Sequence, residues 1–383
     1  MKRIISVFCA VIIIILSVSV GAYALTAEES KSAIDAAYDA YFSGLPGDVN
    51  KDSAFSALDA RTALLASAGY TEGADLSKAD LDGDNVVTAI DARTLLRVSA
   101  GLDNEEILSR NNQLKLFNAF MNSIKAEKLG FRKFSTQENK DVTYDNAATI
   151  NKFNDQMNNL AQIAGESSMD IRDELLKGKG VTTYAYSSVI KEAQADNYPV
   201  IGKDFSSSLT LGDIKSIEYK TNQTYTYAPK TSYGTSVTPA ELTGLDVLTV
   251  YFNSEKIAGS ATNTNSVHSK CFDVPTNESV MKEYNSLNEM FTGELESMIG
   301  SMSVSTNHIS YYDSYISIYF DHDTKKICAT EYGMYCDISI ALKFDLYNLL
   351  LGIDVRNQTV NIVNKDLYKQ EYYFIRNYQS LDR

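Results

Sequence analysis

The sequence has no tryptophan, four cysteines and three histidines in 383 residues. Sugar-binding clefts commonly stack pyranose rings on flat aromatic side chains. A glycoside hydrolase without one tryptophan would therefore be unusual, although 25 tyrosines keep such stacking open. His268, His308 and His322 are scattered, and each is more simply interpreted as a core or surface residue than as a catalyst. Composition thus offers little support for a common hydrolase or a histidine-based metal centre.

Cysteine usage argues against a disulfide-scaffolded domain. If the N-terminal leader is removed, Cys271, Cys328 and Cys336 remain, too few for a scaffold and an odd number for complete pairing. Cys328 and Cys336 flank the segment ATEYGMY, which we expect to form a hairpin turn that places the two side chains opposite each other. A disulfide and two half-buried thiols are both consistent with that arrangement.

The first 24 residues have the pattern of a secretory signal peptide. A positive start, MKR, is followed by the apolar run IISVFCAVIIIILSVSV, and GAYA supplies small residues with the spacing of a signal-peptidase site. We expect cleavage after Ala24 and a secreted protein, with an uncleaved membrane anchor as the alternative.

The mature chain is short of basic residues. Removal of Lys2 and Arg3 leaves 33 basic against 49 acidic side chains, a net charge of −16. No basic cluster offsets this charge, so nucleic acid is not an expected partner, and neither is a membrane after signal cleavage. The acidity suits solubility and cation binding.

What the sequence does contain is an internal repeat. GDVNKDSAFSALDARTALLASAGY begins at Gly47, and ADLDGDNVVTAIDARTLLRVSAGL follows 32 residues later. Counted from Ala57 and from Ala89, nine of fourteen aligned positions are identical. Copies this similar at a fixed offset indicate a duplicated folding unit.

Each copy carries oxygen-bearing side chains at positions 1, 3, 5, 9 and 12 of a twelve-residue loop. This is the spacing of an EF-hand-type calcium loop, in which position 7 offers a backbone carbonyl and the acid at position 12 closes the shell. The expected ligands of two calcium ions are Asp48, Asn50, Asp52, Ala54, Ser56 and Asp59, then Asp80, Asp82, Asp84, Val86, Thr88 and Asp91. The alternative is a pair of acidic turns that only cap helices, which the fixed offset disfavours.

Two positions depart from the EF-hand pattern. Position 12 is aspartate, which must reach further than glutamate to be bidentate. Position 6, usually a glycine with left-handed backbone, is Ser53 in the first loop and Asn85 in the second. Asparagine tolerates this backbone better than serine, so we expect the first site to be the weaker one.

The duplicated loop and helix, without the helix that normally precedes an EF-hand loop, resembles the dockerin module over residues 46–103. The resemblance implies binding to a cohesin domain of a scaffoldin, in a cellulosome or a related surface assembly that degrades polysaccharides. In that family the pair before the loop-closing acid, together with later residues of the same helix, faces the cohesin. Carried over by position, the partner-binding residues are Ala57, Leu58, Leu64, Leu65, Ala89, Ile90, Leu96 and Arg97.

We divide the chain into a signal peptide (1–24), a leading helix (25–45), the dockerin (46–103) and a domain of unknown function (104–383). In the leading segment, apolar residues at helical spacing predict a short helix that leads into or packs on the dockerin. Beyond residue 104, amphipathic helices and tyrosine-rich strands come in blocks. The fold class is thus multidomain: a small all-α calcium-binding module plus an α+β domain with helices against one face of a curved antiparallel sheet.

No motif in the last domain specifies an activity. Ser188 and Lys191 have the spacing of a serine nucleophile and its lysine base, but the accompanying downstream motifs are missing. Asp321 and Asp323 are more simply interpreted as shaping a hairpin turn than as paired carboxylates. Two hypotheses follow: a domain that binds or organises, with plant polysaccharide as a candidate ligand, or a carbohydrate-active hydrolase delivered by the dockerin.

Overall fold

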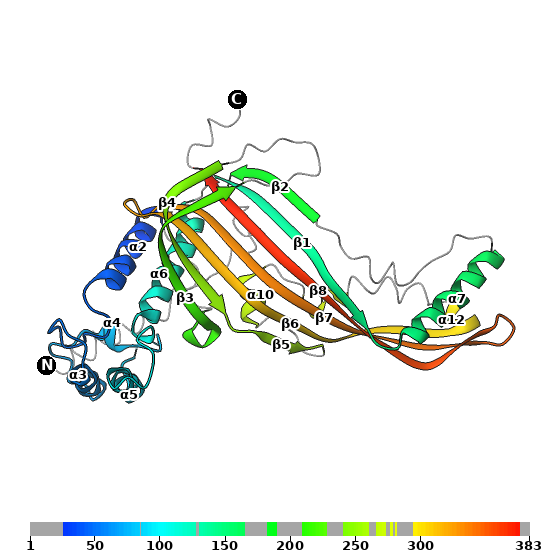
Figure 1. Cartoon of the computed structure of the whole chain (residues 1–383), viewed down its shortest axis with the longest axis horizontal. Helices are drawn as coiled ribbons and strands as arrows, with labels where there is room; N and C mark the ends of the chain where they lie inside the picture. Colours follow the sequence, from blue (N-terminus) through cyan, green and yellow to red (C-terminus); the bar gives the residue numbers. More distant parts are fainter. Residues whose placement is uncertain are drawn as a thin grey trace, which may run out of the picture.

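The computed structural model describes residues 26–84, 86–127, 130–164, 182–189, 209–227, 240–259, 266–272, 276–278, 280–281 and 294–375. Its elements are, in chain order, α2 (Ala27–Phe42), α3 (Ala57–Ser67), α4 (Leu76–Ala79), α5 (Ala89–Ser99), α6 (Ile107–Glu127), β1 (Gly130–Tyr144), α7 (Ala147–Ala164), β2 (Thr182–Val189), η1 (Leu211–Asp213), β3 (Ile214–Tyr227), β4 (Ala240–Phe252), β5 (Glu255–Ala258), α10 (Val267–Cys271), α12 (Glu294–Ile299), β6 (Gly300–Asp321), β7 (Ile327–Asn348) and β8 (Ile353–Ile375). Long strands run between the α3–α5 end and the end that carries α7 and α12 (Figure 1).

The duplicated segment forms a small helical module. Its two main helices, α3 and α5, each begin at a capping box, in which a hydroxyl N-cap and the aspartate three residues later satisfy each other's backbone N–H groups. Val49, Ala63, Ala92 and Leu95 pack between the copies. The same residue pattern that repeats in sequence thus repeats in space, as the sequence predicts.

The larger domain is built on one antiparallel sheet. Its strand order is β2-β1-β8-β7-β6-β4-β3, and β5 pairs with β6. Every pairing is antiparallel. The fold class expected from the sequence, an all-α module plus an α+β domain with an antiparallel sheet, is confirmed.

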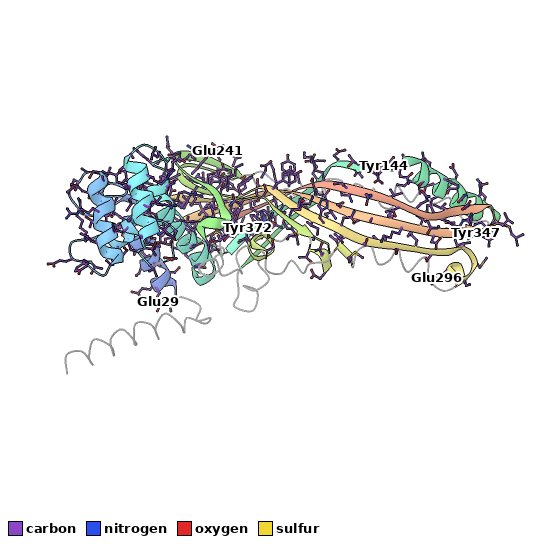
Figure 2. All side chains as sticks on the ribbon, turned by 90° about the horizontal axis from the view of Figure 1, so that it is seen from below. Glu29, Tyr144, Glu241, Glu296, Tyr347 and Tyr372 are labelled. Carbon is purple, nitrogen blue, oxygen red and sulfur yellow. The ribbon has the colours of Figure 1, made fainter. Side chains whose placement is uncertain are left out.

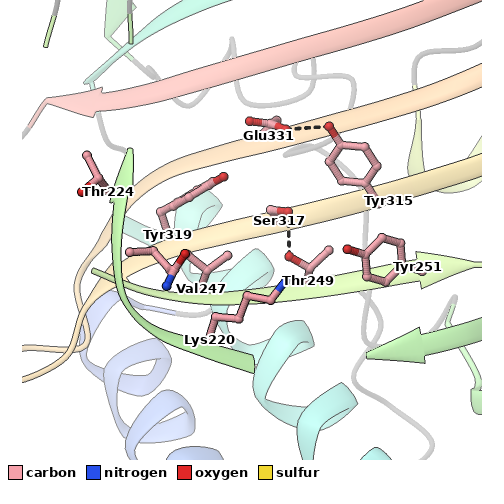
Figure 3. Close-up of a pocket in the computed structure, with 10 residues that line it drawn as sticks. Lys220, Thr224, Val247, Thr249, Tyr251, Tyr315, Ser317, Tyr319 and Glu331 are labelled. Atoms are coloured by element: carbon pink, nitrogen blue, oxygen red, sulfur yellow. Dashed lines mark hydrogen bonds between the residues drawn. The ribbon is translucent and has the colours of Figure 1, made fainter. Parts of the chain in front are cut away.

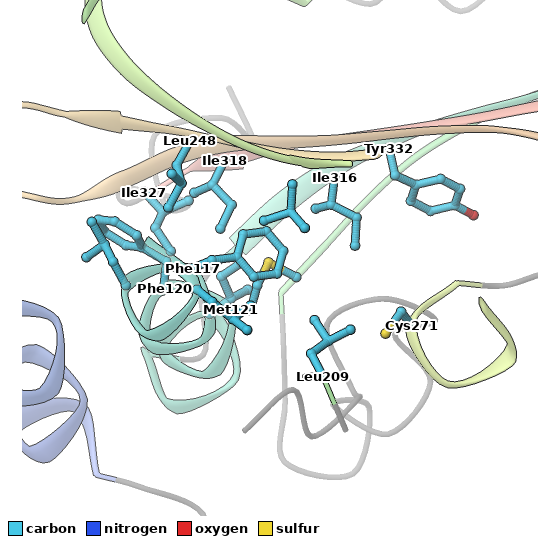
Figure 4. Close-up of a cluster of buried hydrophobic side chains, with 14 of the residues drawn as sticks. Phe117, Phe120, Met121, Leu209, Leu248, Cys271, Ile316, Ile318, Ile327 and Tyr332 are labelled. Atoms are coloured by element: carbon cyan, nitrogen blue, oxygen red, sulfur yellow. The ribbon is translucent and has the colours of Figure 1, made fainter. Parts of the chain in front are cut away.

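Helix α6 covers one face of the sheet near the dockerin. Phe117, Phe120 and Met121 project from the helix onto Ile316 and Ile318 of β6 (Figure 4). The side chains of successive strand residues point to opposite faces, so over residues 314–320 of β6 the even-numbered residues face the core and the odd-numbered ones face away. A second apolar cluster, which includes Phe153 of α7, lies toward the far end of the strands.

Helix α2 joins the sheet domain rather than the dockerin. Ile34 is buried in the same cluster as α6, and Tyr38 and Tyr41 pack against that cluster. Lys325, in the turn after β6, contacts Asp35 at 2.9 Å. Of the two expected alternatives, that α2 leads into the dockerin or packs on it, the structure has the first, and α2 packs on the sheet domain. The dockerin is therefore an insertion between two helices, α2 and α6, that pack on the same sheet.

The predicted turn between Cys328 and Cys336 is absent, because both residues lie on the single strand β7. The two side chains do not form a disulfide. Gly333, within the segment expected to turn, instead makes room for a ring of the neighbouring strand: a Cβ there would meet Tyr315 Cε1 at 2.6 Å. The hairpin turn at Asp321 is present, and the Asp321 carboxylate accepts hydrogen bonds from Thr324 N and Oγ1.

Some expectations fall outside the described residues. They are the signal peptide and Lys191. Among the described residues, no helix is long and apolar enough to cross a bilayer.

Candidate functional site

The second loop gathers three carboxylates. Ligand oxygens of Asp80, Asp82 and Asp84 all lie within 4.8 Å of one another. Partial burial and the neighbouring carboxylates raise the pKa of Asp82 above its ordinary value. Side chains of this kind repel one another unless a cation lies between them, and an all-oxygen donor set suits calcium. The residues present therefore fit the ion that their spacing predicts.

The first loop is organised by hydrogen bonds to its own backbone. Asp48 accepts from the backbone N–H groups of Asp52 and Ser53 at 3.0 and 3.1 Å. Asn50 Oδ1 accepts from Asp52 N, and Asp52 Oδ1 accepts from Ala54 N, both at 2.9 Å. These bonds curl the chain and turn the side chains at positions 1, 3 and 5 to the inside of the turn. The loop is thus shaped by the residues that would hold the metal.

The aspartates at position 12 close both loops. Asp59 is fully buried, and its Oδ1 accepts from Val49 N at 2.8 Å, while Asp91 Oδ1 accepts from Leu81 N at 3.0 Å. Each also accepts at 2.8 Å from the backbone N–H of the N-cap residue, Ser56 or Thr88. The carboxylate therefore ties the start of the loop to the start of the helix. Helix capping and loop closure are two uses of one side chain.

Backbone conformation distinguishes the loops at a position that the sequence reasoning missed. Ser53 has φ +67°, so serine does adopt the left-handed backbone usually given to glycine. Position 4 is left-handed as well: it is Lys51 in the first loop, with φ +62°, and Gly83 in the second, with φ +80°. Asn85 lies outside the described residues. The first loop thus places two side-chain-bearing residues in the strained region.

Helix α6 of the sheet domain contacts the second loop directly. Asn111 Nδ2 donates to the main-chain oxygen of Asp80 at 2.6 Å, and Lys115 Nζ lies 3.5 Å from Asp80 Oδ2. Gly83 permits this approach, because a Cβ there would lie 2.8 Å from Asn111 Oδ1. No local sequence pattern marks these residues, since the contact spans more than thirty positions between two domains.

The predicted partner-binding residues lie on the surface. Leu58, Leu64, Ile90 and Leu96 are large apolar side chains with exposed fractions of 49 to 62 %. Leu65 is 44 % exposed, and Ala57 and Ala89 are exposed as well. Large apolar side chains that gather on a helix surface favour contact with another protein.

Arg97 makes the two faces unequal. Its guanidinium forms a bidentate pair with Asp103, with Nε and Nη2 each 2.7 Å from a carboxylate oxygen. The equivalent residue of the first copy is the apolar Leu65. The charge at Arg97 is therefore partly neutralised within the chain, although its position is polar.

One arrangement in the sheet domain has the order of a hydrolytic triad. His268 Nε2 lies 2.7 Å from Ser314 Oγ, and His268 Nδ1 lies 2.9 Å from Glu255 Oε2. However, Ser314 is 1 % exposed, and the imidazole stacks against Phe272 and Tyr311. A nucleophile must reach its substrate, so this network is best understood as an anchor that joins α10 and β5 to β6.

Residues 46–97 match the family model of the dockerin type I domain. No curated protein and no solved structure matches the chain. Dockerin type I domains bind calcium and cohesin domains, in extracellular assemblies of the cellulosome type. The match, the loop spacing and the paired helices coincide: residues 46–97 are a dockerin type I domain.

Proposed function

We propose that this protein is secreted and attaches through its dockerin to a cohesin domain of a scaffoldin, where the sheet domain contributes to polysaccharide degradation by binding or organising. The observation that carries the proposal is the pair of exposed apolar helix faces, each following an acid-rich loop, the second of which gathers three carboxylates that fit calcium. A calcium-held loop fixes the start of its helix, and thereby fixes the face that the helix presents.

The sheet domain would be attached to the scaffoldin through the dockerin. It holds the dockerin between α2 and α6, so both ends of the module are anchored in one core. A cohesin that binds the exposed faces of α3 and α5 would therefore hold the sheet with little freedom. This geometry suits a protein whose bound ligand has to be kept near partner enzymes.

The test uses the mature chain and a panel of cohesin domains, with binding measured by titration calorimetry. We expect one or more cohesins to bind in calcium and to be released by a chelator, because the loops organise the faces. Binding that is indifferent to chelation, or no cohesin bound at all, would contradict the proposal.

A carbohydrate-active hydrolase is the alternative function. Glu331 of β7 and Glu371 of β8 are directly paired across two strands, and glycoside hydrolysis uses two carboxyl groups. Incubation of the mature chain with plant polysaccharides separates the two functions. Pull-down without release supports binding, whereas new reducing ends that disappear in Glu331→Gln would favour the hydrolase.

A further inference from the structure

The sheet face opposite α6 carries a polar row that crosses five strands. The strand registers bring together one residue from each of β3, β4, β6, β7 and β8: Glu218, Thr249, Ser317, Glu331 and Glu371. Their neighbours on the same strands, such as Leu248, Ile316 and Ile318, point into the core against α6. The row thus lies on the sheet face away from α6, where Thr249 and Ser317 are buried and Glu331 and Glu371 are half-buried.

Tyrosine rings flank this row on both sides along the strand direction. Tyr251 and Tyr315 form one pair, with centroids 6.1 Å apart, and Tyr225 and Tyr319 form the other at 4.8 Å. Figure 3 shows Tyr319 on one side of Ser317 and Tyr315 with Tyr251 on the other. Tyr315 and Tyr319 are four residues apart on β6, a separation of ~13 Å. The rings therefore border a depression of about 310 Å³ with a polar floor.

The polar groups of the floor are held in place. Tyr315 donates from its hydroxyl to Glu331 Oε1 at 2.6 Å, and the hydroxyls of Thr249 and Ser317 are 2.8 Å apart (Figure 3). Gly333 makes the first bond possible, because the Tyr315 ring occupies the space of a Cβ there. These contacts orient the side chains before any ligand arrives, which lowers the entropy lost on binding.

The charges at this surface favour a neutral ligand. Lys220, the lysine at the border, is paired with Glu218 at 2.8 Å, so it offers little to an anion. Burial and the charge of Glu331 raise the pKa of Glu371 to about 7, so near neutral pH the Glu371 carboxyl group is about half protonated. In its protonated form it can donate a hydrogen bond as well as accept one. A ligand with many hydroxyl groups and no charge matches this floor.

We propose that this tyrosine-bordered groove binds a neutral oligosaccharide, with the C–H faces of its sugar rings on Tyr315 and Tyr319 and its hydroxyls on Thr249, Ser317 and Glu331. Aromatic rings at the ends and hydrogen-bonding groups between them are the two contacts that a sugar chain offers. The distance between the rings calls for a short chain rather than a single ring. The proposal deepens the proposed function of the sheet domain and does not depend on cohesin binding.

Titration calorimetry of the mature chain with cellohexaose, xylohexaose and mannohexaose tests it, with an oligogalacturonate as the charged comparison. We expect at least one neutral probe to bind and the charged one to bind more weakly. Tyr319→Ala should weaken binding of that probe about tenfold, and Ser317→Ala about fivefold. Tyr347→Ala, an exposed tyrosine at the far end of β7 (Figure 2), is the matched control and should leave binding unchanged.

Two further measurements keep the outcome interpretable. Tyr315→Phe keeps the ring over Gly333 and removes only the hydroxyl, so it should weaken binding of the oligosaccharide less than Tyr319→Ala does. It also tests the groove with a variant that keeps its fold if Tyr319→Ala is destabilised. Calcium-dependent cohesin binding by each variant reports separately on the dockerin. The proposal is overturned if no neutral probe binds, if the oligogalacturonate binds best, or if Tyr347→Ala weakens binding as much as Tyr319→Ala.

Discussion

Asn111 of α6 donates a hydrogen bond to the main-chain oxygen of Asp80, the first residue of the second calcium loop, at 2.6 Å. One turn further along the helix, Lys115 Nζ lies 3.5 Å from the Asp80 carboxylate. A helix of the sheet domain thus supplies one contact that holds the loop and one cation that competes for its first ligand. Calcium affinity of the second loop is therefore coupled to the sheet domain.

Replacement of Lys115 by methionine should tighten calcium binding to the second loop. The ammonium group lies on the carboxylate that would hold the ion, so its removal takes away a repulsion worth about 1 kcal/mol at a partly exposed site, or about fivefold in affinity. Titration calorimetry of the mature chain measures this. Lys115→Arg keeps the charge and should bind like the original chain. Equal affinities for the methionine and arginine variants would show that the charge has no effect.

Relief of backbone strain should tighten calcium binding to the first loop. Ser53→Gly and Lys51→Gly each place a glycine where φ is above +60°, which should favour the loop by about 1 kcal/mol and raise calcium affinity about fivefold. Asn85→Gly should do less, because asparagine tolerates this backbone. Calorimetry that ranks Asn85→Gly above both others would contradict the explanation from strain.

The ligand pattern could be predicted from the sequence because it is local. Asp48 and Asp59 lie within one twelve-residue loop, and the spacing alone determines which side chains turn inward. The partner of α2 could not be predicted in the same way. The helical period shows that Ile34 is buried but not against what, and the answer lies in contacts such as Lys325 with Asp35, 290 residues apart.

The tyrosine-bordered groove shows the same limit. Alternation within β6 indicates that Tyr315, Ser317 and Tyr319 share a face, yet only the registers of two pairings, β4 with β6 and β6 with β7, bring Thr249 and Glu331 beside them. The turn expected between Cys328 and Cys336 was wrong for a related reason, because Gly333 of that segment lies within a strand. A glycine in a strand signals either a turn or a close approach, and the approaching ring comes from another strand.

Stability of the sheet domain should fall as pH rises through neutrality. Burial and the Glu331 carboxylate raise the folded-state pKa of Glu371 from 4.5 to about 7, so the folded chain binds the proton more tightly than the unfolded chain does. The stabilisation is present below pH 4.5 and is lost as pH approaches and passes 7. After solvent screening we expect a loss of about 1–2 kcal/mol between pH 5 and 8.

Urea denaturation of Glu371→Gln measures this contribution. The amide does not ionise, so this variant should be more stable than the original chain at pH 8 and similar to it at pH 5. Glu218→Gln, at the other end of the polar row, is the control for general charge removal. A pH dependence that persists unchanged in Glu371→Gln would rule out this residue as its source.

Disruption of α2 should unfold the sheet domain and spare the dockerin. Ile34→Asp buries a charge in the cluster shared with α6, which should reduce the stability of that domain by more than about 3 kcal/mol. Ala37→Ser, which changes a partly buried contact of the same helix, should have a much smaller effect. Calcium binding should survive in both variants. If Ile34→Asp removed calcium binding and left the sheet intact, α2 would belong to the dockerin after all.

Cohesin binding should survive the loss of either helix face. The copies share nine of fourteen aligned positions, so a half-turn of the module brings α3 close to the place of α5, and a cohesin that binds one face can bind the other. Replacement of Ala57 and Leu58 by a charged pair should leave measurable binding, and so should replacement of Ala89 and Ile90. Only the fourfold replacement should abolish it, as measured by calorimetry in calcium.

The two orientations should differ in strength. Leu65 of one face corresponds to Arg97 of the other, whose guanidinium is already held by Asp103 at 2.7 Å. Single interface residues shift affinity by more than ~1 kcal/mol, so the two single-face variants should bind with unequal affinities. Arg97→Leu should bring them closer together, because it makes the faces alike. Loss of all binding in one single-face variant, with calcium binding intact, would show that only one face works and that the symmetry is ancestral.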